Sequence, residues 1–136
     1  MWGSLTKLLL FAMLLLCSRQ TVQTIAFLAW LNHQREEGGA EQRQPHLIIV
    51  PASVLTNWIN EFQKFAPDMI VEKYHGNQAE REEIRGALER NYLNGDNPLD
   101  VVLTTFSYFS SDSNKLDRSF LRKFEFDYLV VDEGHT

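Results

Sequence analysis

The residues best suited to chemistry stand near the carboxyl end of the chain, where an apolar run meets two acidic residues. Residues 128–131 are apolar, and Asp132 and Glu133 follow them. In a nucleotide-hydrolysing site, one carboxylate at such a strand end holds magnesium, and a second orients or deprotonates the attacking water. This interpretation makes Asp132 the metal ligand and Glu133 the base. The alternative is that Asp-Glu only ends a strand and starts a turn, which the short string alone favours.

The elements that would position these carboxylates alternate along the chain between apolar runs and helical patterns. The predicted strands are residues 47–50, about 70–74, 100–105 and 128–131. The predicted helices are residues 21–33, a segment that Ser53 caps and that stops before Pro67, residues 78–92 and residues 116–123. Residues 35–44 carry no large apolar side chain and predict a solvated loop. Buried strands that alternate with helices predict an α/β fold, a parallel sheet with helices on both faces.

The polar residues at the predicted strand ends form a second set of candidates. Ligands of parallel α/β sheets bind beyond the carboxyl ends of the strands. Ser53, Thr104, Thr105 and Asp132 all stand at such ends. The serine and the threonines could equally have purely structural roles, because serine is a common helix cap and threonine is common in strands.

Length and charge limit the classes of function. With 136 residues, the chain is long enough for one domain and too short for two. Its net charge of −5 gives no global attraction to nucleic acid, so a contact with DNA must be local. The single cysteine, Cys17, excludes an internal disulfide and a cysteine-based zinc cluster.

The first twenty residues differ from the rest, because Lys7 precedes an unbroken apolar run over residues 8–16. The run is too short for a membrane-spanning helix, which needs roughly 20 residues. Its length fits the apolar part of a secretory signal, with a weak exit at Cys17 and Ser18. The alternatives are a buried strand or helix, or an N-terminus foreign to the domain. We favour the last, because the rest of the chain has an intracellular character.

Four segments resemble the first ATPase lobe of Swi/Snf chromatin-remodelling motors, and they come in the order found in that family. They are residues 21–28 (the helix after the phosphate loop), 45–67 (motif Ia), 101–109 (motif Ib) and 128–135 (motif II, the Walker B element). Gly134, together with the sequence before it, is most similar to the subfamily of the SMARCAD remodellers. The resemblance implies an incomplete RecA-like lobe of the P-loop NTPase class over residues 21–136, behind a separate segment of residues 1–20.

The resemblance also implies ATP and Mg²⁺ as cofactors. Thr21 and Asp132 would hold the metal ion, and Thr21, Gln23 and Asp132 would bind the nucleotide. Glu133 would activate water, and His135 would couple the state of the nucleotide to the rest of the motor.

DNA and nucleosomes are the partners that the resemblance implies, together with a second ATPase lobe, in the nucleus and with no membrane. Ser53, Trp58, Thr104 and Thr105 belong to segments that face DNA in the family. Trp58 lies on an apolar helical stripe, so we predict that it belongs to the core instead.

The phosphate loop departs from the family pattern. The family has Gly-Leu-Gly-Lys-Thr where this chain has Cys17, Ser18, Arg19, Gln20 and Thr21. Without the glycines and the lysine, triphosphate binding and hydrolysis are expected to be weak, since positioning and charge neutralisation supply most of the catalysis.

Two main hypotheses follow from these residues. The first is an enzyme fragment, part of an ATP-dependent DNA translocase that is inactive alone because the lysine and the second lobe are absent from the sequence. The second is a truncated, non-catalytic module that binds DNA or a remodelling complex. A secreted protein that uses residues 8–16 as its signal is a third hypothesis. We also expect an apolar sheet edge and poor solubility.

Overall fold

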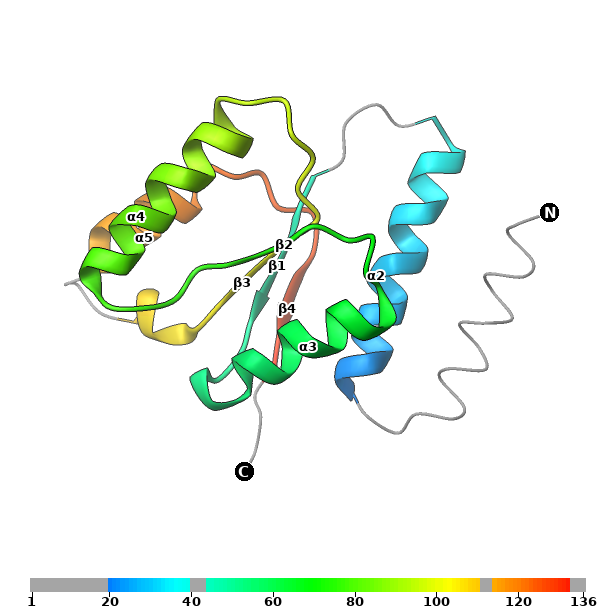
Figure 1. Cartoon of the computed structure of the whole chain (residues 1–136), viewed down its shortest axis with the longest axis horizontal. Helices are drawn as coiled ribbons and strands as arrows, with labels where there is room; N and C mark the ends of the chain where they lie inside the picture. The colour runs from blue at the N-terminus through cyan, green and yellow to red at the C-terminus, as the bar shows by residue number, and fades with distance from the viewer. Residues whose placement is uncertain (1–19, 40–43, 111–113, 133–136) are drawn as a thin grey trace. The chain divides into compact units, whose positions relative to one another are not determined.

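The structure is a computed structural model, and it describes residues 20–39, 44–110 and 114–132. Four strands form one sheet in the order β2-β3-β1-β4, and every neighbouring pair is parallel (Figure 1). The strands are β1 (His46–Ile49), β2 (Val71–Lys73), β3 (Val101–Thr104) and β4 (Leu129–Val131). Each lies within or beside a predicted strand, so the predicted parallel α/β fold is confirmed.

The helices also follow the predicted order. They are α2 (Gln20–Glu37), α3 (Leu55–Phe65), α4 (Gln78–Leu88) and α5 (Lys115–Leu121), with short turns η1 (Ala52–Val54), η2 (Glu89–Leu93) and η3 (Phe106–Tyr108). The five residues of η2 are π-helical and continue α4, so together they cover the predicted helix of residues 78–92. No helix among the described residues is long and apolar enough to cross a membrane.

Two details of the prediction are wrong. The residues 35–37 that were expected in a loop continue α2, where the His33 ring lies 3.3 Å from the Glu37 carboxylate one turn further on. Ser53 does not cap a helix, because it lies inside η1 and Pro51 occupies the cap position. A proline fits that position because its fixed φ suits the residue next to a helical turn.

The chain divides into two compact units, each described by itself. The first contains α2 and residues 56–69, which include most of α3. Trp58 is 1% exposed and its ring centroid lies 6.3 Å from that of Phe62, which is 2% exposed. The prediction that Trp58 is a core residue is therefore confirmed.

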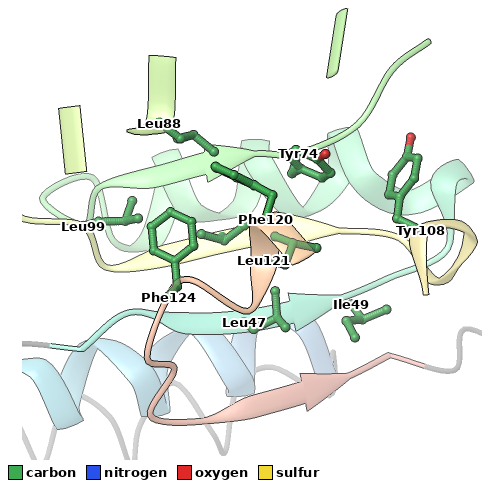
Figure 2. Packing of buried hydrophobic residues seen from close by; sticks show 10 residues of the cluster. Leu47, Ile49, Tyr74, Leu88, Leu99, Tyr108, Phe120, Leu121 and Phe124 are labelled. Atoms are coloured by element: carbon green, nitrogen blue, oxygen red, sulfur yellow. The ribbon is translucent and has the colours of Figure 1, made fainter. Parts of the chain in front are cut away.

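The second unit contains residues 44–55 and the chain from residue 70 onward, and thus the whole sheet. Figure 2 shows its hydrophobic cluster, in which Phe120 of α5 lies near Tyr74 and Leu121 lies toward Leu47 of β1. The opposite face of the sheet is also apolar, since Ile48 and Leu103 are paired in register and both are 0% exposed. Burial on both faces explains why β1 and β3 read as continuous apolar runs.

Strand β4 differs from the other strands because its side chains are exposed. Leu129 is 62% exposed, although it is the register partner of Leu47, which is 7% exposed. Val131 is 37% exposed, and it pairs with the buried Ile49. As the last strand in the sheet order, β4 presents an apolar edge in the described structure.

Candidate functional site

The carboxyl ends of all four strands meet at one edge of the sheet in the second unit. The Asp132 N–H donates to the Ile49 carbonyl over 2.8 Å, and the Val50 N–H donates to the Thr104 carbonyl over 2.9 Å. The Tyr74 N–H donates to the Leu103 carbonyl over 2.8 Å. We call this region the strand-end edge and define it as residues 50–53, 74–76, 105–107 and 132. It is where ligands bind in parallel α/β sheets.

Asp132 follows β4 at this edge and is half-buried. Glu133, Gly134 and His135, the other residues of the predicted acidic motif, lie outside the described residues. A carboxylate in this place is a hard oxygen donor of the kind that magnesium prefers, so Asp132 fits the predicted ion. Among the described residues there is no group of three or more His, Cys, Asp and Glu side chains that could hold a metal ion by itself.

The other predicted nucleotide-binding residues belong to the first unit. Thr21 and Gln23 lie at the start of α2 and are both half-buried. The hydroxyl of Thr24, one residue further, donates to the Gln20 carbonyl over 2.9 Å. The Thr21 hydroxyl is also an oxygen donor of the magnesium-binding kind. Gln20, where the family has lysine, is exposed and carries no charge for a phosphate.

The candidate DNA contacts differ sharply in exposure. Thr104 is 0% exposed, and its hydroxyl donates to the Tyr74 carbonyl over 2.8 Å. Thr105 is 2% exposed, and its hydroxyl lies 2.7 Å from that of Ser107. Ser53 and Ser107 are exposed, as is Phe106 at 49%. Phe106 and Ser107 are thus accessible residues of the edge that the sequence did not single out.

A buried polar cluster beside this edge carried no sequence motif. It consists of Tyr74, Arg81, Arg85 and Asp117, which come from the end of β2, from α4 and from α5. One Asp117 oxygen accepts from Arg81 Nε and Arg85 Nη1, both over 3.0 Å, and from the Tyr74 hydroxyl. Asp117 is 2% exposed, so both arginines neutralise a buried carboxylate. Only the spacing of Arg81 and Arg85, four residues apart on one helix face, was visible in the sequence.

This cluster changes the acidity of its members. Burial and the hydrogen bond to Asp117 raise the pKa of Tyr74 to about 12, from 10.0. Burial disfavours the charge on Arg81, but the hydrogen bond and the charge of Asp117 outweigh it and raise the pKa of the guanidinium. The tyrosine therefore stays neutral and the arginine stays charged at neutral pH.

The turn after β3 is held in place by residues of the polar cluster and of the loop after β2. We call η3 together with its two neighbours, Thr105 and Phe109, the η3 turn. Tyr108 is 5% exposed, and its hydroxyl lies 2.9 Å from His75 Nδ1 and accepts from the Gly76 N–H over 3.1 Å. The Arg81 guanidinium lies over the Tyr108 ring, 4.7 Å from its centroid. The strand-end edge and the polar cluster are therefore physically joined.

The parallel sheet and the acidic residue after β4 agree with a comparison to known families. The SNF2-related domain matches residues 19–136. The chain belongs to the SNF2-related domain family. This membership confirms the predicted resemblance to Swi/Snf ATPases and, with the parallel sheet, the RecA-like α/β fold class.

Individual SNF2 relatives agree with this assignment. The chain is 45% identical over 116 residues to the ATP-dependent helicase FUN30 of Saccharomyces cerevisiae, and 46% identical to the ATP-dependent helicase fft3 of Schizosaccharomyces pombe. It is 38% identical to a mouse protein named SWI/SNF-related matrix-associated actin-dependent regulator of chromatin subfamily A containing DEAD/H box 1. Each alignment covers 85% of this chain but only 9%, 11% and 10% of the respective relative. The chain thus spans about a tenth of their length.

Proposed function

We propose that this chain provides part of the first ATPase lobe of a nuclear, DNA-translocating chromatin remodeller, with ATP and Mg²⁺ as cofactors and nucleosomal DNA as the partner. The observation that carries the proposal is the position of Asp132, directly after a strand of the parallel sheet in an SNF2-related domain. Relatives that align over 85% of the chain are named ATP-dependent helicases. A second ATPase lobe would be a further partner.

For the nucleotide, we propose the residue roles that the resemblance to Swi/Snf ATPases implies. Asp132 and Thr21 would supply oxygen ligands to magnesium, and Gln23 would contact the nucleotide. Glu133 would orient or deprotonate the attacking water, and His135 would relay the state of the nucleotide. Bound magnesium would neutralise charge on the phosphates. Because Gln20 supplies no positive charge, we propose that this chain binds ATP weakly and hydrolyses it poorly.

A comparison of two glutamine-to-lysine variants tests the nucleotide site. Gln20→Lys should raise the affinity for a fluorescent ATP analogue, measured with magnesium, by about tenfold, the scale of one charge-assisted contact. Gln63→Lys makes the same change at an exposed position of α3 and should leave the affinity unchanged. Asp132→Asn in the Gln20→Lys background should abolish the magnesium dependence. Micromolar binding by the unaltered chain would contradict the role given to Gln20.

The uncharged Gln20 also favours a second candidate function, a non-catalytic module that binds DNA. The exposed Ser53 and Ser107 of the strand-end edge carry hydroxyls that can donate to DNA phosphates, and the exposed Phe106 precedes Ser107. Binding to a labelled duplex is measured by fluorescence anisotropy. Duplex binding without ATP binding would favour the module, and binding of both ligands would favour the motor fragment.

A further inference from the structure

The η3 turn has one accessible side and one buried side. Phe106 and Ser107 face solvent, whereas Tyr108 is 5% exposed. Within the turn, the Phe109 N–H donates to the Phe106 carbonyl over 2.9 Å, and the Thr105 and Ser107 hydroxyls are 2.7 Å apart. The contacts of the buried side therefore bear on the geometry of the exposed side.

The Tyr108 hydroxyl holds the turn to the loop after β2. It accepts from the Gly76 N–H over 3.1 Å, and it lies 3.2 Å from the Gly76 carbonyl and 2.9 Å from His75 Nδ1. Gly76 has a φ of 143°, and a Cβ at this position would collide with the Glu80 side chain. The loop therefore depends on glycine, and its backbone N–H and C=O lie close to the tyrosine hydroxyl.

Arg81 holds the same tyrosine from α4. Its guanidinium lies 4.7 Å from the Tyr108 ring centroid, and its Nη1 donates to the Gly76 carbonyl over 2.7 Å. Its Nε donates to the buried Asp117 over 3.0 Å, so the guanidinium has little freedom to move. One side chain thus connects the loop after β2, the η3 turn and α5.

We propose that Tyr108 and Arg81 are positioning residues for DNA binding, which hold the η3 turn in the conformation that presents the Ser107 hydroxyl to the DNA backbone. This rests on the proposed function, in which the strand-end edge binds DNA. The physical reason is preorganisation: a turn that is already ordered loses less conformational entropy on binding. Neither residue touches the DNA.

Two tyrosine variants separate positioning from simple stabilisation. Tyr108→Phe and Tyr92→Phe each remove one hydroxyl, and that of Tyr92 donates to Glu72 over 2.7 Å in the same unit. Both variants should lower the thermal midpoint of the 136-residue chain, Tyr108→Phe by more, because its hydroxyl has three polar partners. Only Tyr108→Phe should weaken duplex binding, by about three- to tenfold, the equivalent of one hydrogen bond. It should also speed hydrogen exchange of the Phe109 amide.

Two arginine variants make the same test for Arg81. Arg81 and Arg85 are each 3.0 Å from Asp117, they are similarly exposed at 15% and 18%, and each makes one further hydrogen bond. Only Arg81 lies over the Tyr108 ring. Arg81→Gln should therefore weaken duplex binding more than Arg85→Gln, although both remove one positive charge and one ion pair with Asp117.

The outcomes separate this proposal from the proposed function. If the unaltered chain fails to bind the duplex, both are overturned. If it binds, and both variants of each pair bind with equal affinity at a temperature where all are folded, only the positioning role is overturned. Weaker binding by Tyr108→Phe and Arg81→Gln alone, together with faster exchange at Phe109, supports it.

Discussion

The two outer strands of the sheet, β2 and β4, differ in how tightly the side chains at each edge are held. Beyond β2, Tyr74 is 0% exposed, stacks on Phe120 with ring centroids 5.7 Å apart, and hydrogen-bonds to a buried carboxylate. At β4, Leu129 and Val131 lie on the surface at 62% and 37% exposure. The β2 edge carried no recognisable motif, whereas β4 precedes the acidic motif. Residues that identify a family therefore need not be those that stabilise its fold.

The physical reason for this contrast lies in the kind of interaction at each edge. A buried cluster of two arginines, a tyrosine and an aspartate is stable only if every member is paired, so it depends on several elements at once. The carboxylate of Asp132, for which we propose a metal-binding role, follows directly after a strand. The polar cluster cannot be recognised from the sequence, because its members are far apart along the chain. The acidic residue after a strand can be recognised from a few consecutive residues.

The largest expected effect is the loss of stability caused by Leu47→Ala, which is compared with the same substitution at its register partner Leu129. Leu47→Ala should lower the free energy of unfolding by about 2–4 kcal/mol, because it empties space in the hydrophobic cluster. Leu129→Ala removes the same atoms from the exposed register partner and should cost less than about 0.5 kcal/mol. Chemical denaturation of both variants measures the difference. Equal losses would mean that β4 is covered in solution.

A smaller effect is expected from the charge of the polar cluster. Asp117→Asn keeps the shape of the side chain but leaves Arg81 and Arg85 without their counter-charge. Because both arginines retain some access to water, we expect a loss of about 2–3 kcal/mol, below the range for a fully buried pair. Asp96→Asn, at an exposed position, is the matched control and should be neutral. If Asp117→Asn left the free energy of unfolding unchanged, the cluster would not be what holds the β2 edge.

The smallest of these effects concerns Thr104, whose predicted role was a DNA contact. Thr104→Val removes the hydroxyl that donates to the Tyr74 carbonyl, and leaving this buried carbonyl unpaired should cost about 1–2 kcal/mol. Thr56→Val makes the same change at an exposed residue of α3 and serves as the control. If duplex affinity falls while stability does not, Thr104 acts on DNA directly. Unfolding curves and anisotropy titrations on the same samples decide between the two roles.

Much of the fold was predictable from local pattern. The apolar runs at residues 47–50 and 100–105 predicted buried strands, and the stripe that includes Trp58 predicted a core helix. Ser53 was misassigned because serine is a frequent cap, whereas here the helical turn starts one residue after Pro51 and includes Ser53. The predicted boundary after residue 20 and the metal-binding roles of Thr21 and Asp132 stay predictions.

By itself, the sequence determined the family, the parallel α/β class and the placement of Asp132 after its last described strand, because apolar periodicity and strand ends are local properties. Only the tertiary structure decided that Thr104 and Thr105 are buried while Phe106 and Ser107 are exposed. It also decided that Tyr74, Arg81 and Asp117 meet, since residues 43 and 36 positions apart come together only through packing of α4 and α5 beside the sheet. Contacts across such separations depend on which faces the sheet brings together, and no short segment encodes them.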